Sequence, residues 1–185
     1  MPSDRERLLA ILKEKSFQRR EVILASGRRS SFYIDCKQTA LTAEGHYLIG
    51  RLVLEEIGSI AGGVDAVAGV TLGGDPLVSA VSLTSYVEGK PLPALIIRKE
   101  LKGHGTEAWI EGMNNVRPGA RVVMIEDVVT TGGSTLRACA KARDAGLSVA
   151  GVIALVDRQE GGRKAIEAAG HSLSALFVKS DFIKE

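Results

Sequence analysis

The sequence predicts an α/β protein whose helices flank a mainly parallel central sheet. The first observation is that short apolar runs alternate with amphipathic helical patterns along most of the chain. The second is that several of these runs are apolar throughout, as expected for strands buried on both faces. With 185 residues, 45% hydrophobic and 25% charged, the chain has the size and composition of one globular domain spanning residues 1–185.

Local signals place most of the helices and strands. Ser3 and Glu6 have the spacing of a capping box, Gly58 follows a helical pattern and Pro76 suits the first turn of a helix. The expected helices cover residues 3–15, 42–57, 76–87, 136–145 and 163–169. The expected strands cover 22–24, 31–35, 64–70, 94–97, 122–125, 148–156 and 172–178, the first two paired as a hairpin, and residues 179–185 have no predicted role.

Composition excludes several classes of function. The net charge of +2 is too balanced for a general nucleic-acid binder. The longest apolar runs fall short of membrane-spanning length, and the charged N-terminus is unlike a signal peptide. Cys36 and Cys139 lack the spacing of a zinc or redox motif, so we expect reduced thiols in a cytoplasmic protein.

Residues 122–135 organise the rest of the chain. An apolar run, 122–125, predicts a buried strand; two acids, Glu126 and Asp127, follow it, and a loop of Thr, Gly and Ser leads into a helix. Such a loop at a helix N-terminus favours phosphate, because backbone N–H groups point outward and the helix dipole is positive there. The acids suit ribose hydroxyls, which donate hydrogen bonds. The residues therefore predict a site for a phosphate attached to a ribose, although an ordinary strand-turn-helix connection is the alternative.

Three other segments carry candidate site residues. Residues 98–105 bring cations, a histidine and glycines to the end of a predicted strand, which favours a mobile lid at about 99–112 over a solvated surface loop. Arg158 also follows a strand, where ligands bind in open α/β sheets. Residues 31–35 contain two aromatics and are either a cover for a flat ligand or simply an edge strand.

The central motif resembles the phosphoribosyl-pyrophosphate (PRPP) motif of the type I phosphoribosyltransferases. Residues 98–105, 31–35 and 157–162 further resemble the catalytic loop, the N-terminal substrate segment and the DRxEGG segment of the members of that family that act on orotate. The resemblance implies a type I phosphoribosyltransferase fold, with a small N-terminal hood at about 17–40. It also implies transfer of the 5-phosphoribosyl group from PRPP to orotate, giving orotidine 5′-monophosphate and pyrophosphate in pyrimidine synthesis.

The resemblance also implies roles for individual residues. Lys102 and His104, with Arg98, Lys99 and Asp127, would be catalytic. The PRPP-binding residues would be Glu126, Asp127, Val128, Val129, Thr130, Thr131, Gly132, Gly133, Ser134 and Thr135, with Thr71, Leu72, Gly73 and Gly74 around the pyrophosphate. The orotate-binding residues would be Thr130, Arg158, Phe32 and Tyr33.

The same resemblance implies Mg²⁺ held mainly through PRPP and water, with no direct protein ligand, and a homodimer whose loop residues Lys102 and His104 act in the neighbouring subunit. No nucleic-acid or membrane partner is expected. Two departures weaken the detailed roles: some family members have lysine where this chain has Ala25-Ser26 and Gly73.

Two alternatives stay open at this point. A phosphoribosyltransferase for a purine such as adenine or xanthine would keep the central motif but would need neither the basic loop nor Arg158. A PRPP-sensing regulator of transcription or RNA would use the same fold without catalysis, but it should add a nucleic-acid surface that this nearly neutral chain lacks.

Overall fold

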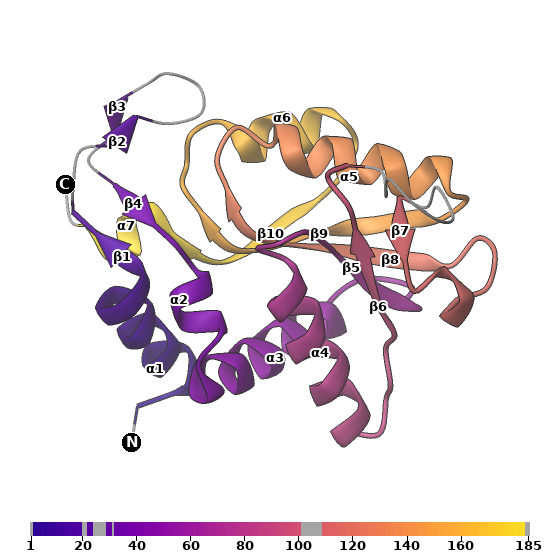
Figure 1. The fold of residues 1–185 in the computed structure, drawn as a ribbon, viewed down its shortest axis with the longest axis horizontal. Helices are drawn as coiled ribbons and strands as arrows, with labels where there is room; N and C mark the ends of the chain where they lie inside the picture. Colours follow the sequence, from indigo (N-terminus) through magenta and orange to yellow (C-terminus); the bar gives the residue numbers. More distant parts are fainter. Residues whose placement is uncertain (1, 20–21, 24–28, 31, 101–108, 184–185) are drawn as a thin grey trace.

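A mainly parallel sheet forms the centre of the fold (Figure 1). The structure is a computed structural model that describes residues 2–19, 22–23, 29–30, 32–100 and 109–183. Within these residues the strand order is β10-β9-β8-β5-β6-β7, and every neighbouring pair is parallel except β6 with β7. The strands are β5 (Ala66–Val70), β6 (Ala94–Ile97), β7 (Ile110–Glu111), β8 (Arg121–Val129), β9 (Ser148–Asp157) and β10 (Leu173–Val178).

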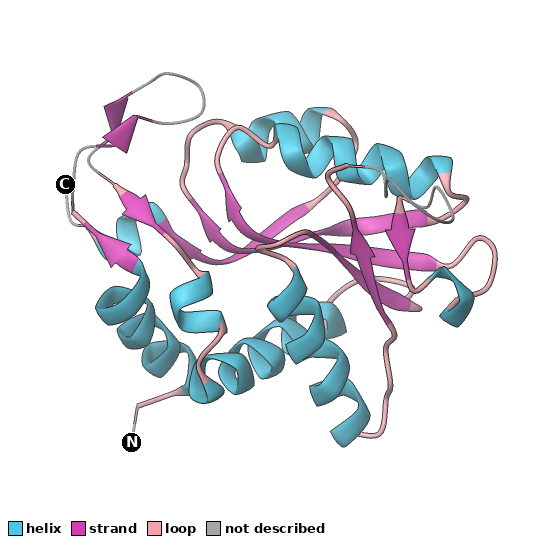
Figure 2. Ribbon diagram, in the orientation of Figure 1, coloured by secondary structure: helices cyan, strands magenta, loops and turns pink. Residues whose placement is uncertain are grey.

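Helices cover both faces of this sheet, as Figures 1 and 2 show. One face carries α1 (Asp4–Ile11), α2 (Lys37–Ala40), α3 (Ala43–Gly58) and α4 (Asp75–Val87), and the other carries α5 (Gly133–Asp144) and α6 (Gly162–Ala168). Successive residues of β8 supply the two cores in turn: Val123 and Ile125 pack toward α3 and α4, whereas Val122 and Met124 pack toward α5. The predicted α/β class with a mainly parallel sheet is therefore confirmed.

The capping signals act as the sequence predicts. The backbone N–H of Ser3 donates to Oε2 of Glu6 over 2.8 Å, and the backbone N–H of Glu6 donates to Oγ of Ser3 over 3.2 Å. Thr42 caps α3 by accepting from the backbone N–H of Gly45 over 3.0 Å. Pro76 lies in the first turn of α4, where its missing N–H costs nothing. Helices α1 and α3 therefore begin directly after their predicted caps, and α4 begins at Asp75, one residue before Pro76.

The predicted hairpin between residues 22–24 and 31–35 is wrong in its pairing. Instead β2 (Val22–Ile23) pairs antiparallel with β3 (Arg29–Ser30), and β4 (Tyr33–Ile34) pairs antiparallel with β1 (Phe17–Gln18). The second pairing buries apolar surface, because Phe32 and Ile34 lie in the main core and the ring of Phe17 lies 5.1 Å from the ring of Phe32. Burial therefore decides which short strands pair.

Three further elements differ from the sequence prediction. Strand β8 continues through Glu126 and Asp127 to Val129, because β9 supplies pairing partners as far as Asp157. Strand β7 lies inside the segment 99–112 that was expected to be a loop. The final segment forms α7 (Lys179–Phe182), and π-helical η1 (Leu12–Ser16) and 3₁₀ helix η2 (Met113–Asn115) complete the described elements.

Helix α7 anchors the C-terminal segment through one aromatic side chain. The ring of Phe182 lies 5.8 Å from Phe17, 5.7 Å from Phe32 and 6.4 Å from Phe177, measured between ring centroids. These distances are those of favourable aromatic pairs. The segment thereby fixes β1 and the chain entering β4 against the end of β10. Across the described residues, the structure contains no helix with the length and apolar character required to cross a bilayer.

Candidate active site

A cavity of about 400 Å³ opens at the carboxyl ends of β5, β6 and β8. Because the carboxyl ends of parallel strands meet at one edge of a sheet, the loops that follow these strands converge there. The cavity is lined by Lys37, Val70, Thr71, Leu72, Gly73, Lys99, Glu126, Asp127, Val128 and Ser134. Three segments singled out in the sequence therefore contribute to one cavity.

The two adjacent carboxylates point to opposite faces of β8. Glu126 is 4% exposed and faces α5, where its Oε1 accepts a hydrogen bond from Oγ1 of Thr135 over 2.9 Å. Asp127 lies on the other face, where its carboxylate approaches Gly73 and its Oδ1 accepts from the backbone N–H of Val128 over 2.9 Å. A strand places successive side chains on alternate faces, so the pair reaches around both sides of the strand end.

Burial shifts the protonation of both acids. Burial raises the pKa of Glu126 to about 7, a rise that the hydrogen bond from Thr135 opposes and the nearby charge of Asp127 increases. Burial also raises the pKa of Asp127 above its ordinary value, and the backbone N–H of Val128 and the charge of Lys37 oppose that rise. Glu126 is thus a carboxyl group that changes charge near neutral pH.

The loop after β5 approaches Asp127 closely. A β-carbon at position 73 would overlap the Asp127 carboxylate, so the glycine leaves room for that side chain. The peptide bond between Thr71 and Leu72 is cis, and the N–H of Gly74 donates to the carbonyl of Val70 over 2.8 Å. The loop therefore lies against the acid from the neighbouring strand.

The loop after β8 ends at the N-terminus of α5, as the sequence predicts. Gly132 has φ of +81°, and a β-carbon there would lie 3.1 Å from the carbonyl oxygen of Gly162 in α6. Only glycine meets both conditions without strain. The first turn of α5 contains Gly133, Ser134 and Thr135, whose amides lack partners within the helix. Hydroxyl and amide donors together make this turn suited to an anion.

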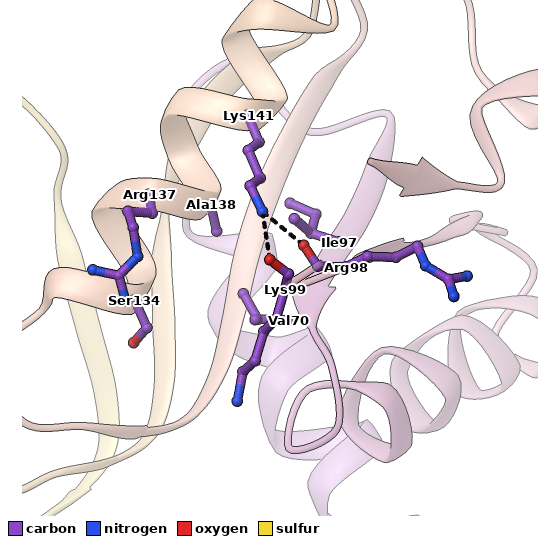
Figure 3. A pocket seen from close by; sticks show the side chains of 8 residues that line it. All are labelled: Val70, Ile97, Arg98, Lys99, Ser134, Arg137, Ala138 and Lys141. Carbon is purple, nitrogen blue, oxygen red and sulfur yellow. Dashed lines mark hydrogen bonds between the residues drawn. The ribbon is translucent and has the colours of Figure 1, made fainter. Parts of the chain in front are cut away.

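Four cations gather near the end of β6 (Figure 3). Lys99 lines the cavity together with both acids, and Lys141 of α5 donates to the carbonyls of Arg98 and Lys99. The side chain of Arg98 points away from Lys99 and pairs with Glu111, Nη1 to Oε1 over 2.6 Å. Arg137 lies on the same side of α5. The predicted catalytic residues Lys102 and His104 lie outside the described residues.

Lys37 is a cavity residue that the sequence reading missed. Its Nζ pairs with Oδ1 of Asp35 over 2.6 Å, and its charge opposes the rise in the pKa of Asp127. The only signal available in the sequence was its position two residues after Asp35, just beyond the segment 31–35 that could cover a flat ligand. A lone lysine in a short helix gives no periodic pattern, so the fold was needed to find it.

Arg158 lies at the end of β9, as predicted, within a buried polar group. The guanidinium is 5% exposed, donates from Nη2 to the carbonyl of Phe32 over 2.9 Å, and pairs with Oε1 of Glu160 over 2.9 Å. It also lies over the ring of Phe32, 5.3 Å from the centroid. The preceding Asp157 accepts from the backbone N–H of Gln159 over 2.8 Å. These contacts hold the guanidinium in a fixed orientation.

The two aromatic residues expected near a base occupy different environments. Phe32 is fully buried among Phe17 and Phe182, whereas Tyr33 is half-buried on the paired strand β4. The buried ring holds the Phe32 backbone in place, and the carbonyl of Phe32 accepts the hydrogen bond from Arg158. That the Phe32 ring flanks a pyrimidine stays a prediction, and its burial favours the supporting role.

Comparison with known proteins agrees with this geometry. The phosphoribosyl transferase domain family matches residues 38–172, which include the carboxylate pair and the loop between β8 and α5. The chain therefore belongs to the phosphoribosyl transferase family.

The more similar relatives identify the branch of that family. An orotate phosphoribosyltransferase of Sorangium cellulosum is 57% identical over 99% of this chain and 95% of its own length, and one of Synechocystis is 50% identical over 96% and 87%. The crystal structure of Mycobacterium tuberculosis orotate phosphoribosyltransferase in complex with PRPP has 34% identity and a TM-score of 0.79, covering 97% of this chain and 99% of that one. Within its family, the chain belongs with the orotate phosphoribosyltransferases.

Proposed function

We propose that this protein transfers the 5-phosphoribosyl group from PRPP to orotate, yielding orotidine 5′-monophosphate and pyrophosphate in pyrimidine biosynthesis. The observation that carries the proposal is 57% identity, over nearly the whole chain, to a curated orotate phosphoribosyltransferase. The cavity supports it, because it combines two carboxylates, an anion-binding helix N-terminus and a lysine. In the reaction the bond from the anomeric carbon to pyrophosphate breaks, and a bond to a ring nitrogen of orotate forms as that nitrogen gives up its proton to pyrophosphate or solvent.

The PRPP would be divided between the end of β8 and the loops that follow β5 and β8. The first turn of α5, with Thr130 to Thr135, would bind the 5-phosphate through amides and hydroxyls, and Val128 and Val129 would set the loop's path. Glu126 and Asp127 would accept hydrogen bonds from the ribose hydroxyls. Residues 71–74 would hold the pyrophosphate, with the backbone N–H groups of Leu72 and Gly73 as donors, because those of Thr71 and Gly74 already donate to other carbonyls. The contribution of all three segments to one cavity supports that division.

The positive charges would stabilise the departing pyrophosphate, on which negative charge builds as its bond to the anomeric carbon breaks. For Lys99 the proposal is supported by its position in the lining of the cavity that also contains both acids. Arg98, Lys102 and His104 share the proposal through the family resemblance, the last two from a segment outside the described residues. Arg158 would pair with the orotate carboxylate, with Thr130 and Tyr33 nearby, since a planar guanidinium suits a planar carboxylate.

Magnesium fits this arrangement as an ion carried by the substrate. Carboxylates are its preferred protein ligands, and the cavity offers Glu126 and Asp127 on opposite faces of a strand. The described residues contain no group of three or more His, Cys, Asp or Glu side chains that could hold a metal. As the family resemblance implies, water and PRPP oxygens would supply most of its ligands, and when bound it would neutralise charge on the pyrophosphate.

We also propose a homodimer, formed through an apolar groove between α3 and α4. The groove is lined by Leu41, Thr42, Ala43, His46, Tyr47, Ala80, Leu83, Thr84 and Val87. Leu41 and Val87 are 73% and 75% exposed, so the groove presents large apolar side chains to solvent. A second copy of the chain is the proposed occupant, because the resemblance expects each subunit to lend its basic loop to the other.

The two buried free cysteines agree with the proposed cytoplasmic location.

The dimer has two tests. Leu83→Asp should convert dimer to monomer in sedimentation, whereas the surface control Lys164→Asp should not. Mixing inactive Lys102→Ala and Asp127→Asn subunits should restore part of the activity. A monomeric wild-type protein, or no recovery despite confirmed subunit exchange, would remove the shared site.

The activity itself is tested by pyrophosphate release from PRPP and Mg²⁺ in the presence of orotate, adenine, xanthine or uracil. Release with orotate alone is the expected result. Release with a purine would retain the PRPP site but overturn the base assignment. PRPP binding without release for any base would instead favour the regulator.

A further inference from the structure

We propose that Lys141 is a positioning residue, which acts by holding the backbone of Lys99 so that the Lys99 side chain enters the cavity beside Glu126 and Asp127. The proposal rests on the proposed function, because its consequence is measured in the PRPP reaction. Lys141 itself lies outside that cavity, on the far side of the β6 terminus. The family resemblance in the sequence did not include it.

Lys141 binds two consecutive carbonyl groups at the point where β6 leaves the sheet. Its Nζ lies 2.8 Å from the carbonyl oxygen of Arg98 and 3.2 Å from that of Lys99 (Figure 3). The pairing of β6 with β5 ends at Ile97, so the ladder does not extend to these two residues. An ammonium group has three donors, and here two of them replace the missing sheet contacts.

Lys141 also contacts Trp109, the residue immediately before β7. Its Nζ lies 3.5 Å from the ring centroid of Trp109, close enough for a cation–π interaction. The N–H of Arg98 donates to the carbonyl of Trp109 over 2.9 Å, so the two segments already face each other. One lysine thus joins the outgoing backbone and the Trp109 side chain to α5.

Helix α5 connects the Lys141 contacts to the loop between β8 and α5. Ser134, Arg137, Ala138 and Lys141 follow the i, i+3, i+4, i+7 spacing that places side chains on one helix face, and all four line a second cavity of about 180 Å³ together with Lys99. Burial and the charge of Arg137 lower the pKa of Lys141 below its ordinary value. Helix α5, which begins at the proposed anion site, therefore also holds Lys99 in place through Lys141.

The geometry requires the carbonyl and the side chain of Lys99 to point in different directions, and Figure 3 shows this arrangement. The carbonyl faces Lys141, while the side chain extends away from Lys141 and lines the cavity with both acids. Releasing the carbonyl would let the residue rotate. The ammonium group would then leave the place where pyrophosphate charge is proposed to build.

The test is a double-mutant cycle with Lys141→Met and Lys99→Ala. Methionine keeps the apolar stem of Lys141 but removes the donors and the charge. Lys99→Ala keeps the carbonyl that Lys141 binds and removes only the side chain thought to be positioned. We expect Lys141→Met to lower kcat/KM for PRPP by about tenfold in the wild-type background and by less than about twofold in the Lys99→Ala background.

Two controls separate positioning from folding. Lys164→Met, on the exposed surface of α6, should change neither activity nor melting temperature. Lys141→Arg should restore part of the activity, because a guanidinium also donates to two carbonyls. Equal losses from Lys141→Met in both backgrounds, or a loss explained by unfolding alone, would overturn the proposal. A wild-type protein inactive with every base would instead contradict the proposed function, which the same assay reports separately.

Discussion

The carboxylate of Asp127 occupies the space that a β-carbon at position 73 would need. Gly73 lies in the loop after β5 and Asp127 lies in β8, so the relationship joins two neighbouring strands of the sheet. It also bears on a departure from the family pattern, because some members have lysine at this position. In this chain a side chain there could enter only if the acid moved.

Gly73→Lys should therefore reduce activity rather than add a useful cation. We expect kcat/KM for PRPP to fall by about tenfold or more, because displacing Asp127 costs more than a new exposed charge contributes. Gly73→Ala should lose nearly as much, since the clash begins at the β-carbon. Gly58→Ala is the control, because a β-carbon there meets no atom within 4 Å. Activity at or above wild type in Gly73→Lys would show that Asp127 relocates freely.

The raised pKa of Glu126 predicts how stability depends on pH. The carboxyl titrates near pH 4.5 when unfolded and near 7 when folded, so between these values the folded state keeps a proton that the unfolded state has released. Stability should therefore fall as pH rises from 4.5 to 7, by on the order of 2–3 kcal/mol for this group, and then level off. Urea unfolding at pH 5 and pH 8 should show a smaller difference for Glu126→Gln than for wild type. Matching differences in the two proteins would contradict the assignment.

The hydroxyl of Thr135 should tune the same carboxyl. Its hydrogen bond over 2.9 Å favours the charged form of Glu126, so Thr135→Val should raise the pKa further. If the charged form accepts ribose hydroxyls, the pH at which PRPP binding is half-maximal should rise by about 0.5–1 unit. Thr135→Ser keeps the hydroxyl and should behave as wild type. An unchanged midpoint in Thr135→Val would show that the hydrogen bond does not control Glu126.

Phe182 should be the main anchor of the C-terminal segment. It is 9% exposed and its ring faces those of Phe17, Phe32 and Phe177. Phe182→Ala should lower the free energy of unfolding by about 2–4 kcal/mol through the cavity it leaves. Lys179→Ala in the same helix should change it by less than about 0.5 kcal/mol. A loss below 1 kcal/mol for Phe182→Ala would indicate that the helix contributes little to the fold.

Long elements and the central motif could be predicted from sequence, for physical reasons. Strands such as β5 and β9 are apolar along most of their length, and helices such as α3 begin at a capping side chain, so each carries several independent signals. The acids and the phosphate-type loop are adjacent in the chain, so their proximity does not depend on tertiary pairing.

The remaining features depend on contacts that a local pattern does not encode. Two-residue strands such as β1 and β4 have no measurable periodicity, and their pairing is decided by Phe17 and Ile34 reaching the core. Phe32 illustrates the same difficulty, because an aromatic beside a strand can face either a ligand or the core. The contribution of Lys141 arises from a helix meeting two carbonyl groups 42 and 43 residues away in the chain.

The extension of β8 through both acids limits which insertions and deletions this strand can tolerate. Substitutions can be tested one at a time, but deleting a single residue between Arg121 and Ile125 would shift the strand by one position. Each carboxylate would then exchange faces: Glu126 would turn from Thr135 toward the Gly73 loop, and Asp127 would turn toward α5. The site would keep the same residues, but each carboxylate would lie where the other one lay before. Length in this strand is therefore as strictly constrained as residue identity.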